Sequence, residues 1–245
     1  MAKAAAPLAY AWHVQTIGVL GGLGPQATMD FEARVHRVAQ RLIAPSGNRG
    51  YPPMVVYYCR FVPHAAPEPG SPLRAHPDLL RAAAELGRLA DFIVVTSNFV
   101  HLFRSELEEA AGCELLSMVD LALDEVVRRA WRKVGVLGFG DPLVYTHRLP
   151  ASNVRSETID GPLRVRLDAA IDEVMEGHAG RDAGDVAREA LDVLRARDVD
   201  GIVLGCTEIA LLLRDADKSA PDLLDPLELL AEAAVERARQ NDLSG

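Results

Sequence analysis

Two stretches of the chain repeat one another, and this repeat restricts the fold more than any other feature. IGVLGG at 17–22 has a counterpart in VGVLGF at 134–139, and DFIVVTSN at 91–98 has a counterpart in DGIVLGCTE at 200–208. The second pair follows an aspartate and ends in a small nucleophilic side chain, Ser97 in one copy and Cys206 in the other. Short apolar runs rich in β-branched residues are typical of strands buried on both faces of a parallel sheet. The repeat therefore predicts two similar halves.

Strands and amphipathic helices alternate along the rest of the chain. Strands are expected at 16–20, 54–58, 92–96, 133–138 and 201–205. Apolar residues recur at helical spacing in three sets, which are Phe31, Val35, Val38 and Leu42; Leu167, Ile171, Val174 and Met175; and Val186, Ala190, Leu191 and Leu194. This alternation predicts an α/β fold of two pseudo-symmetric three-layer halves with parallel sheets. We place the halves at 1–115 and 116–225, with a C-terminal helix at 226–245 that completes the first half.

The ends of the repeated strands are the expected site. Ligands of open α/β sheets bind at the carboxyl ends of the strands. The repeat thus predicts that Ser97 and Cys206 lie on opposite walls of one cleft between the halves. A proline-rich segment at 59–77 has no periodicity and is expected to be a long loop. Such loops are often lids or binding loops, and a stiff surface excursion is the alternative.

Composition excludes several classes of protein. The chain has 245 residues, 49% of them hydrophobic and 25% charged, with a net charge of −9. An acidic chain does not suit nucleic acid or an anionic membrane surface as a main partner. Three cysteines in no framework spacing indicate a reduced, cytoplasmic protein. The sequence has neither the apolar core of a signal peptide nor a run of about 18 apolar residues that would span a membrane.

The glycine-rich turn after the first expected strand has two interpretations. Gly22, Gly24 and Ala27 match G-x-G-x-x-A, a pattern that cradles the pyrophosphate of a dinucleotide. The second strand lacks the acidic residue that would bind the ribose hydroxyls of NAD. Arg60 after this strand could instead bind the 2′-phosphate of NADP, so that cofactor stays an alternative. Binding of a substrate carboxylate by backbone N–H groups at a helix N-terminus needs fewer assumptions.

The GCTE sequence at 205–208 carries the most chemistry. A cysteine where a strand turns into a helix lies among free N–H donors, which can lower a thiol pKa from about 8.5 to roughly 3.5–7.5. The alternative is that Cys206 is a small buried apolar residue. Thr207, Glu208 and the mirrored pair Ser97 and Asn98 favour a site.

Other residue types give no competing site. His101 and His147 lie nearest the expected cleft, and we interpret them as hydrogen-bonded structural residues. We expect no metal, because no His, Cys and Asp cluster has the spacing of metal ligands.

Several segments together resemble the aspartate/glutamate/hydantoin racemase superfamily. They are IGVLGGLGPQAT near the start, SNFVH at 97–101, ELEEAAGCELLSMVD, KVGVLG at 133–138 and GCTEIALLL at 205–213. They occur in the order and spacing of that family over nearly the whole chain. The resemblance implies two pseudo-symmetric α/β domains, an active site between them and a homodimer. It also implies proton transfer at a carbon next to a carboxylate, without any cofactor.

The resemblance assigns a role to each matching residue. Cys206 matches the second of the family's two acid/base cysteines, and Ser97 occupies the place of the first. Asn98 and Thr207 match side chains that hold the substrate carboxylate, beside backbone amides of the glycine loop. The expected catalytic residues are thus Cys206 and Ser97, and the expected substrate-binding residues are Gly22, Gly24, Asn98, Thr207 and Glu208.

Three departures from the family pattern affect the expected substrate. A hydroxyl at Ser97 is a far weaker acid than a thiol, so the two faces of the substrate would meet groups of unequal strength, with Cys206 as the favoured base. The alternative is that Ser97 only caps the next helix. The family's arginine and lysine for a side-chain carboxylate are replaced by His64–Ala65 and Glu176, and Arg60, Arg74 and Arg104 are the available substitutes. Phe139 between two glycines replaces a threonine-bearing loop.

These observations predict a racemase- or epimerase-type isomerase that acts on a small carboxylate and is not a plain aspartate racemase. Two alternatives stay open. One is a decarboxylase or cis–trans isomerase of the same superfamily that uses a single cysteine, and the other is a ligand-binding descendant without catalysis.

Overall fold

Each repeated stretch builds one four-stranded parallel sheet in the computed structural model, which describes residues 14–45, 47–66, 72–178, 180, 182–213 and 215–239. The first sheet has the order β2-β1-β3-β4 and the second has the order β6-β5-β7-β8. The two orders are the same once the strands of each half are numbered from its start. The prediction of two pseudo-symmetric α/β halves is therefore confirmed.

The strands are short, and five of them lie close to the expected positions, namely β1, β2, β3, β5 and β7. Their bounds are β1 Ile17–Gly21, β2 Met54–Tyr58, β3 Phe92–Val95, β4 Leu115–Leu116, β5 Lys133–Leu137, β6 Arg155–Glu157, β7 Gly201–Leu204 and β8 Leu223–Leu224. The strand β6 is polar, with the sequence Arg-Ser-Glu, and β8 has two residues, so neither gives the apolar run that marks the central strands. That is why the sequence did not predict them.

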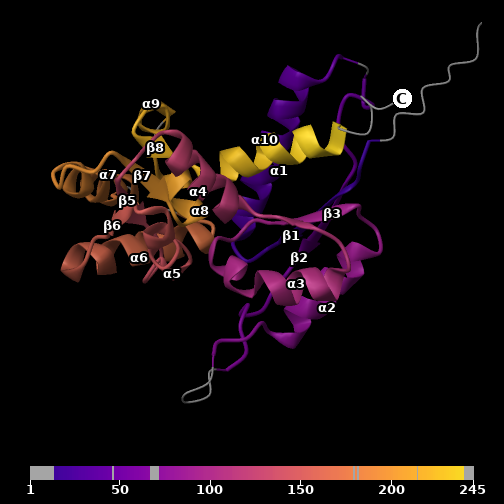
Figure 1. Ribbon diagram of the computed structural model, residues 1–245, viewed down its shortest axis with the longest axis horizontal. Helices are drawn as coiled ribbons and strands as arrows, with labels where there is room; N and C mark the ends of the chain where they lie inside the picture. Colours follow the sequence, from indigo (N-terminus) through magenta and orange to yellow (C-terminus); the bar gives the residue numbers. More distant parts are fainter. Residues whose placement is uncertain are drawn as a thin grey trace, which may run out of the picture.

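Helices cover both faces of each sheet (Figure 1). Their bounds are α1 Pro25–Leu42, α2 Pro77–Gly87, α3 Arg104–Ala111, α4 Met118–Arg128, α5 Leu143–Thr146, α6 Gly161–Met175, α7 Ala183–Arg195, α8 Thr207–Leu212, α9 Asp215–Lys218 and α10 Pro226–Arg239, with 3-10 helices η1 Phe99–Phe103 and η2 Leu149–Ser152. Alternate residues of β3 face opposite layers, as a buried strand requires. Phe92 and Val94 pack in the core with α1, α4 and α10, whereas Ile93 and Val95 pack in the core with α2 and α3.

The aspartates that precede the repeated strands have the same structural task in both halves. Asp91 Oδ2 accepts a hydrogen bond of 2.6 Å from the backbone N–H of Thr16, next to β1. Asp200 Oδ2 accepts bonds of 2.6 and 2.8 Å from the N–H groups of Arg132 and Lys133, at the start of β5. Each aspartate ties the start of one central strand to its neighbour, which explains why the repeat includes it.

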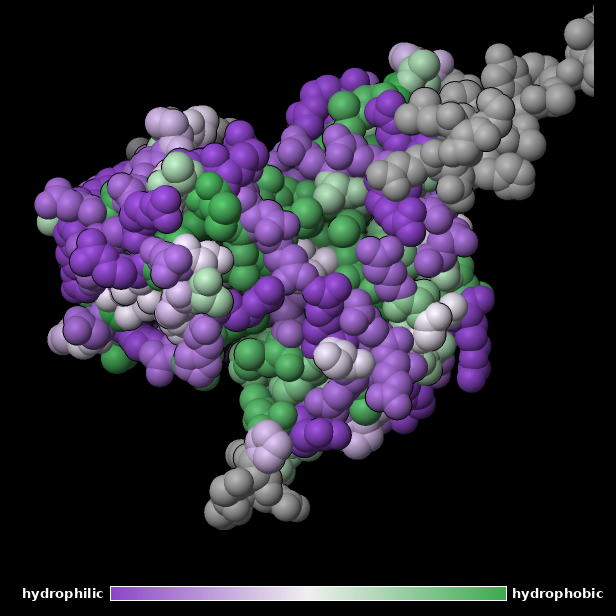
Figure 2. Space-filling model, in the orientation of Figure 1, coloured by the Kyte–Doolittle hydropathy of each residue, from purple (hydrophilic) through white to green (hydrophobic). Residues whose placement is uncertain are grey.

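One hydrophobic core joins the two halves. It contains Val19 of β1 and Phe31 of α1 together with Val136 of β5 and Val203 of β7. The helices α4 and α10 lie in this core and pack against each other. Figure 2 shows one face of the molecule, in which hydrophobic residues gather toward the middle, while the outer helices are largely hydrophilic. Among the described residues, no helix is both long and apolar enough to cross a membrane.

The C-terminal helix α10 returns to the first half of the chain and packs against α1. The described part of this helix ends at Arg239, and residues 240–245 of the expected helix lie outside the described residues. The boundary near residue 115 stays a prediction, because α4 beyond it packs in the core that both halves share.

A buried arginine fastens α10 to α1. The side chain of Arg34 on α1 is 5% exposed and pairs with three carboxylates. The nitrogen–oxygen distances are 2.7 Å to Asp30, 2.5 Å to Asp225 and 3.2 Å to Glu228. Asp225 and Glu228 lie at the start of α10, so the guanidinium also meets the end of the helix that carries a positive partial charge. The ion pairs with these carboxylates offset the repulsion between the guanidinium and this positive end of the helix.

We expect Arg34→Met to lower the free energy of unfolding by about 3 kcal/mol, because it leaves partly buried carboxylates without their cation. Arg37→Met is the matched control, since Arg37 lies on the same helix and pairs with Glu228 but is 57% exposed. It should lower the free energy of unfolding by about 1 kcal/mol or less. Urea denaturation measures both values, and equal losses would contradict the assignment.

Candidate active site

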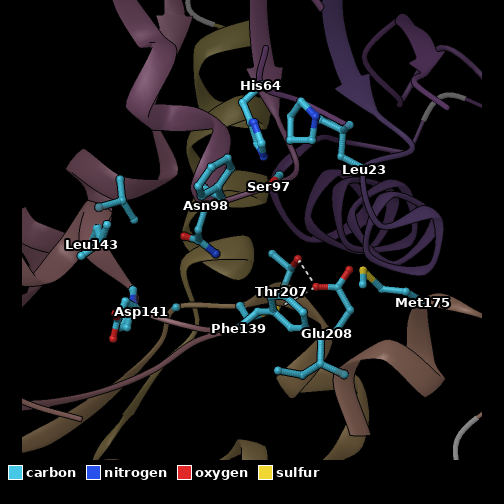
Figure 3. A pocket seen from close by; sticks show the side chains of 17 residues that line it. Leu23, His64, Ser97, Asn98, Phe139, Asp141, Leu143, Met175, Thr207 and Glu208 are labelled. Carbon is cyan, nitrogen blue, oxygen red and sulfur yellow. Dashed lines mark hydrogen bonds between the residues drawn. The ribbon is translucent and has the colours of Figure 1, made fainter. Parts of the chain in front are cut away.

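The carboxyl ends of β3 and β7 open into one cavity of about 350 Å³. Ser97 and Cys206 both line it, and each lies two residues beyond the end of its strand. Both strands pair in parallel with a central neighbour in equivalent register, β3 with β1 and β7 with β5. The prediction that the repeated strand ends meet at one site agrees with this geometry. In Figure 3, His64, Ser97 and Leu23 lie on one side of the cavity, with Thr207, Phe139 and Glu208 on the other.

Asn98 presents a hydrogen-bond donor to the cavity. Its side chain lines the cavity, and the residue is 4% exposed. Its Oδ1 accepts a hydrogen bond of 2.6 Å from the hydroxyl of Tyr145, which comes from α5 in the other half. Among the groups of the described residues, its Nδ2 has no hydrogen-bond partner. Figure 3 shows this nitrogen directed toward the middle of the pocket. Because the bond from Tyr145 fixes the oxygen on the side away from the cavity centre, the amide directs its N–H groups at the pocket, which suits a carboxylate ligand.

Cys206 has a different electrostatic environment from the one that its place at a helix N-terminus predicts. Its Sγ donates to Glu208 Oε2 at 3.1 Å, and Thr207 Oγ1 donates to the same oxygen at 2.9 Å. Burial and the negative charge of Glu208 raise the pKa of the Cys206 thiol well above its ordinary value. The N–H groups of Glu208 and Phe139 act in the opposite direction and are outweighed. The expectation of a lowered thiol pKa is therefore wrong, and Cys206 is a neutral thiol at neutral pH.

The glycine turn holds Glu208 in place. A Cβ atom on Gly24 would clash with Glu208 Oε1, so a glycine here leaves room for that carboxylate. Gly22 has φ +79° and lies against the backbone of Cys59, a position that only glycine fits. Its N–H donates to Thr28 Oγ1 at 2.9 Å. Neither glycine lines the cavity, and Leu23 between them does. We assign Gly22 and Gly24 to packing, and the Glu208 carboxylate lies directly against Gly24.

Ser97 is half-buried and faces the cavity, and Asn98 takes the N-cap position of η1 instead of it. The backbone carbonyl of Ser97 accepts a hydrogen bond of 2.9 Å from His101 Nδ1. Burial lowers the pKa of His101 to about 4, so its imidazole is neutral at neutral pH. His101 lies outside the lining of the cavity and supports the turn that carries Ser97. This agrees with its interpretation as a structural residue.

The cavity is mainly apolar. Its apolar lining side chains are Leu23, Pro63, Phe99, Phe139, Pro142, Leu143, Val144, Ile171 and Met175. Pro63 and His64 belong to the proline-rich segment, which favours its interpretation as a binding loop. Glu176, the expected counterpart of the family lysine, does not line the cavity, and the preceding Met175 does.

The three arginines considered as substitute anchors do not reach the cavity. Arg60 is exposed, Arg74 lies 3.5 Å from Glu106, and Arg104 pairs with Glu108 and Asp120. Among the described residues, no arginine or lysine lines the site.

Several residues of the site were not predicted. Ile171 and Met175 line the cavity, whereas Tyr145 lies behind the lining and holds Asn98. Tyr145 lies in the quoted GFGDPLVYTHRL segment, but a fully buried tyrosine that reaches the other half leaves no local signal. Met175 was placed on the apolar face of its helix, where periodicity alone does not separate the core from a cavity wall. The apolar face of α6 packs in the core at Leu167 and lines the cavity at Ile171.

Comparison with known proteins places the chain in a family. The sequence model of Asp/Glu/Hydantoin racemase matches residues 20–234. Among solved structures, a putative Asp/Glu racemase from Yersinia pestis aligns with a TM-score of 0.72 and 24% identity, covering 92% of this chain and 100% of that one. An aspartate racemase homologue from Pyrococcus horikoshii aligns with a TM-score of 0.69 and 20% identity, covering 92% and 99% of the two chains. These identities establish a shared fold.

A curated relative is also similar in sequence. The broad specificity amino-acid racemase RacX of Bacillus subtilis is 30% identical over 123 residues. The match spans 50% of this chain and 53% of that protein. The chain therefore aligns with about half the length of this relative.

We expect Tyr145→Phe to weaken binding of propanoate about threefold to tenfold, because the Asn98 amide loses the bond that fixes its orientation. Titration followed by NMR measures the affinity. Tyr51→Phe is the matched control, since the Tyr51 hydroxyl bonds to Gln40 at 2.9 Å, away from the cavity. In an Asn98→Ala background, Tyr145→Phe should change the affinity no further. An unchanged affinity in the single variant would contradict the positioning role.

The pKa of Cys206 gives a second prediction. Alkylation by iodoacetamide requires the thiolate, so modification of Cys206 should be slow at neutral pH and should rise only above its ordinary pKa. Glu208→Gln removes one of the two causes of the raised pKa and should move this rise to lower pH. Glu176→Gln, outside the cavity, should leave it in place. Peptide mapping separates Cys206 from Cys59 and Cys113, and rapid alkylation of Cys206 at pH 7 would contradict the neutral thiol.

Proposed function

Because the chain belongs to the Asp/Glu/Hydantoin racemase family, we propose that it is a cofactor-independent isomerase that moves a proton at a carbon alpha to a carboxylate. Family membership supports a racemase- or isomerase-type activity. The observation that carries the specific proposal is that Cys206 and Ser97, at equivalent strand ends of the two halves, line the same cavity. A homodimer and a cytoplasmic location are part of this proposal.

The substrate carboxylate binds at Asn98 in this proposal. Nδ2 of Asn98 is a buried donor without a partner among the described residues, and it loses little orientational freedom when it binds, because Tyr145 already holds the amide. Removal of the α-proton moves negative charge onto the carboxylate oxygens, so a fixed donor stabilises the transition state more than the ground state. Such donors are worth about 3–4 kcal/mol each in enzymes where they have been measured.

Cys206 carries out the proton transfer, with Glu208 as its proton acceptor. The thiol proton already points at Glu208 Oε2, 3.1 Å from Sγ, and Thr207 holds the same oxygen. When the thiol proton moves to this carboxylate, the thiolate can remove the α-proton of the substrate, and Glu208 keeps the displaced proton. Gly24 and Thr207 thus serve catalysis through the position of Glu208.

Ser97 returns a proton on the opposite face of the substrate. The alkoxide that this leaves takes a proton from solvent, and Glu208 releases its proton to solvent, which restores the starting state. Ser97 is the weaker partner because a hydroxyl holds its proton far more tightly than a thiol. The two faces therefore differ. We expect exchange of the α-proton through Cys206 to be faster than inversion of configuration, which needs both residues.

A second candidate is decarboxylation by one cysteine, and the neutral state of the Cys206 thiol favours it. The bond between the α-carbon and one carboxylate breaks, carbon dioxide leaves, and the electron pair on carbon takes the thiol proton. No second acid is needed. A ligand-binding protein without catalysis is the third candidate, and it requires that Cys206 take no part in any turnover.

The test is incubation with carboxylic acids and amino acids of both configurations in deuterated water, with α-deuterium, configuration and carbon dioxide measured together. Cys206→Ala should lower α-exchange by about 10²–10⁴-fold. Ser97→Ala should abolish inversion while exchange persists, and a decarboxylase would lose no activity in this variant. Cys113→Ser is the matched control for loss of a thiol outside the cavity. Absence of Cys206-dependent α-exchange and of carbon dioxide release across the panel would contradict catalysis.

A further inference from the structure

We infer, on the basis of the function proposed above, that the substrate bears an apolar side chain in place of a second carboxylate. Three features of the cavity carry this inference. They are its apolar walls, the charges that line it and the buried Nδ2 of Asn98, which faces it without a partner among the described residues.

The apolar walls come from both halves of the chain. Leu23 and Phe99 belong to the first half, and Phe139, Leu143, Ile171 and Met175 belong to the second. Phe99, Phe139 and Leu143 are 39%, 49% and 40% exposed and lie together in the lining of one cavity, whereas apolar side chains with no binding role are exposed singly over a surface. A ligand with an apolar side chain would remove this surface from water, and each burial is favourable by the hydrophobic effect.

The charges that line the cavity disfavour a second carboxylate. Asp141 and Glu208 are acidic, and among the described residues no arginine or lysine lines the site. Asp141 pairs with Arg164 at 2.7 Å, so that cation is already partnered. His64 is the remaining basic side chain of the lining, and its Nδ1 donates to the carbonyl of Ala65 at 2.9 Å. A second carboxylate would lose its hydration and would find no arginine or lysine of the described lining to pair with, which is costly.

The polar end of the cavity provides for one carboxylate. Nδ2 of Asn98 is directed into the pocket and has no partner among the described residues (Figure 3). The Thr207 hydroxyl is already bound to Glu208, and the Glu208 carboxylate would repel an anion that approached it. One carboxylate at Asn98, with the rest of the substrate along the apolar walls, satisfies these constraints together.

Binding of two inert acids tests the inference without turnover. 3-Phenylpropanoate and succinate share one carboxylate and an ethylene chain, and they differ in whether the other end is apolar or charged. Isothermal titration calorimetry should show 3-phenylpropanoate binding about tenfold to a hundredfold more tightly, because the ring becomes buried. Phe139→Ala should remove most of this difference. Equal affinities, or tighter binding of succinate, would overturn the inference.

A charge introduced into the wall gives a second test. Met175→Lys places a cation in the cavity, so it should tighten succinate and weaken 3-phenylpropanoate, each by about tenfold or more. Val165→Lys is the matched control, because Val165 lies on the same helix but is 70% exposed and outside the cavity. The same change in both variants would show a general charge effect and overturn the inference. Thermal unfolding of each variant establishes that it is folded.

These measurements separate the inference from the proposed function. Preferential binding of 3-phenylpropanoate without α-deuterium exchange in any acid would support the apolar cavity and contradict the isomerase. Exchange of aspartate in preference to phenylalanine and leucine, with Cys206 required, would support the isomerase and contradict the apolar substrate.

Discussion

The core shared by the two halves is the constraint on which the site depends. Each sheet brings its own functional residue only to its own edge, and neither half alone encloses a cavity. The packing of α4 and α10 with strands of both sheets, together with the ion pairs of Arg34, fixes how the edges face one another. The bond between Tyr145 and Asn98 is a polar contact that crosses from one half to the other beside the cavity. The orientation of the Asn98 amide, the proposed hydrogen-bond donor to the substrate, thus follows from how the two halves pack.

A second interaction sets the chemistry of the thiol. The N-terminus of a helix favours an anion, but α8 is short, with six residues, and the Glu208 carboxylate lies beside Sγ. Desolvation and this like charge decide the outcome, and the pKa rises. The same carboxylate that keeps the thiol neutral is positioned to accept its proton. Cys206 is therefore held as a neutral acid beside a proton acceptor, which suits both reactions proposed above.

The walls of the cavity explain why family membership leaves the substrate open. In the proposed reaction the groups that act at the α-carbon lie at strand ends, whereas the groups that meet the substrate side chain lie on loops and on α6. Loops vary without disturbing a sheet, so one fold can present different walls to different side chains. Here His64 and Met175 line the cavity near the positions where the family pattern has cations. In the proposed assignment, the apolar wall is the property that disfavours an acidic amino acid as the substrate.

The sequence by itself determined the two α/β halves, the central strands and the meeting of Ser97 with Cys206, because each of these follows from local periodicity and from the repeat. The polar β6 and the two-residue β8 escaped prediction, since strands at the edge of a sheet need no apolar run. Only the tertiary structure decided the state of Cys206, the partnership of Tyr145 with Asn98 and the true place of Gly22 and Gly24. Each of these depends on a group distant in the chain or on burial, such as the Glu208 carboxylate lying against Gly24. The electrostatics of a site are set by distances in space, and sequence spacing does not contain them.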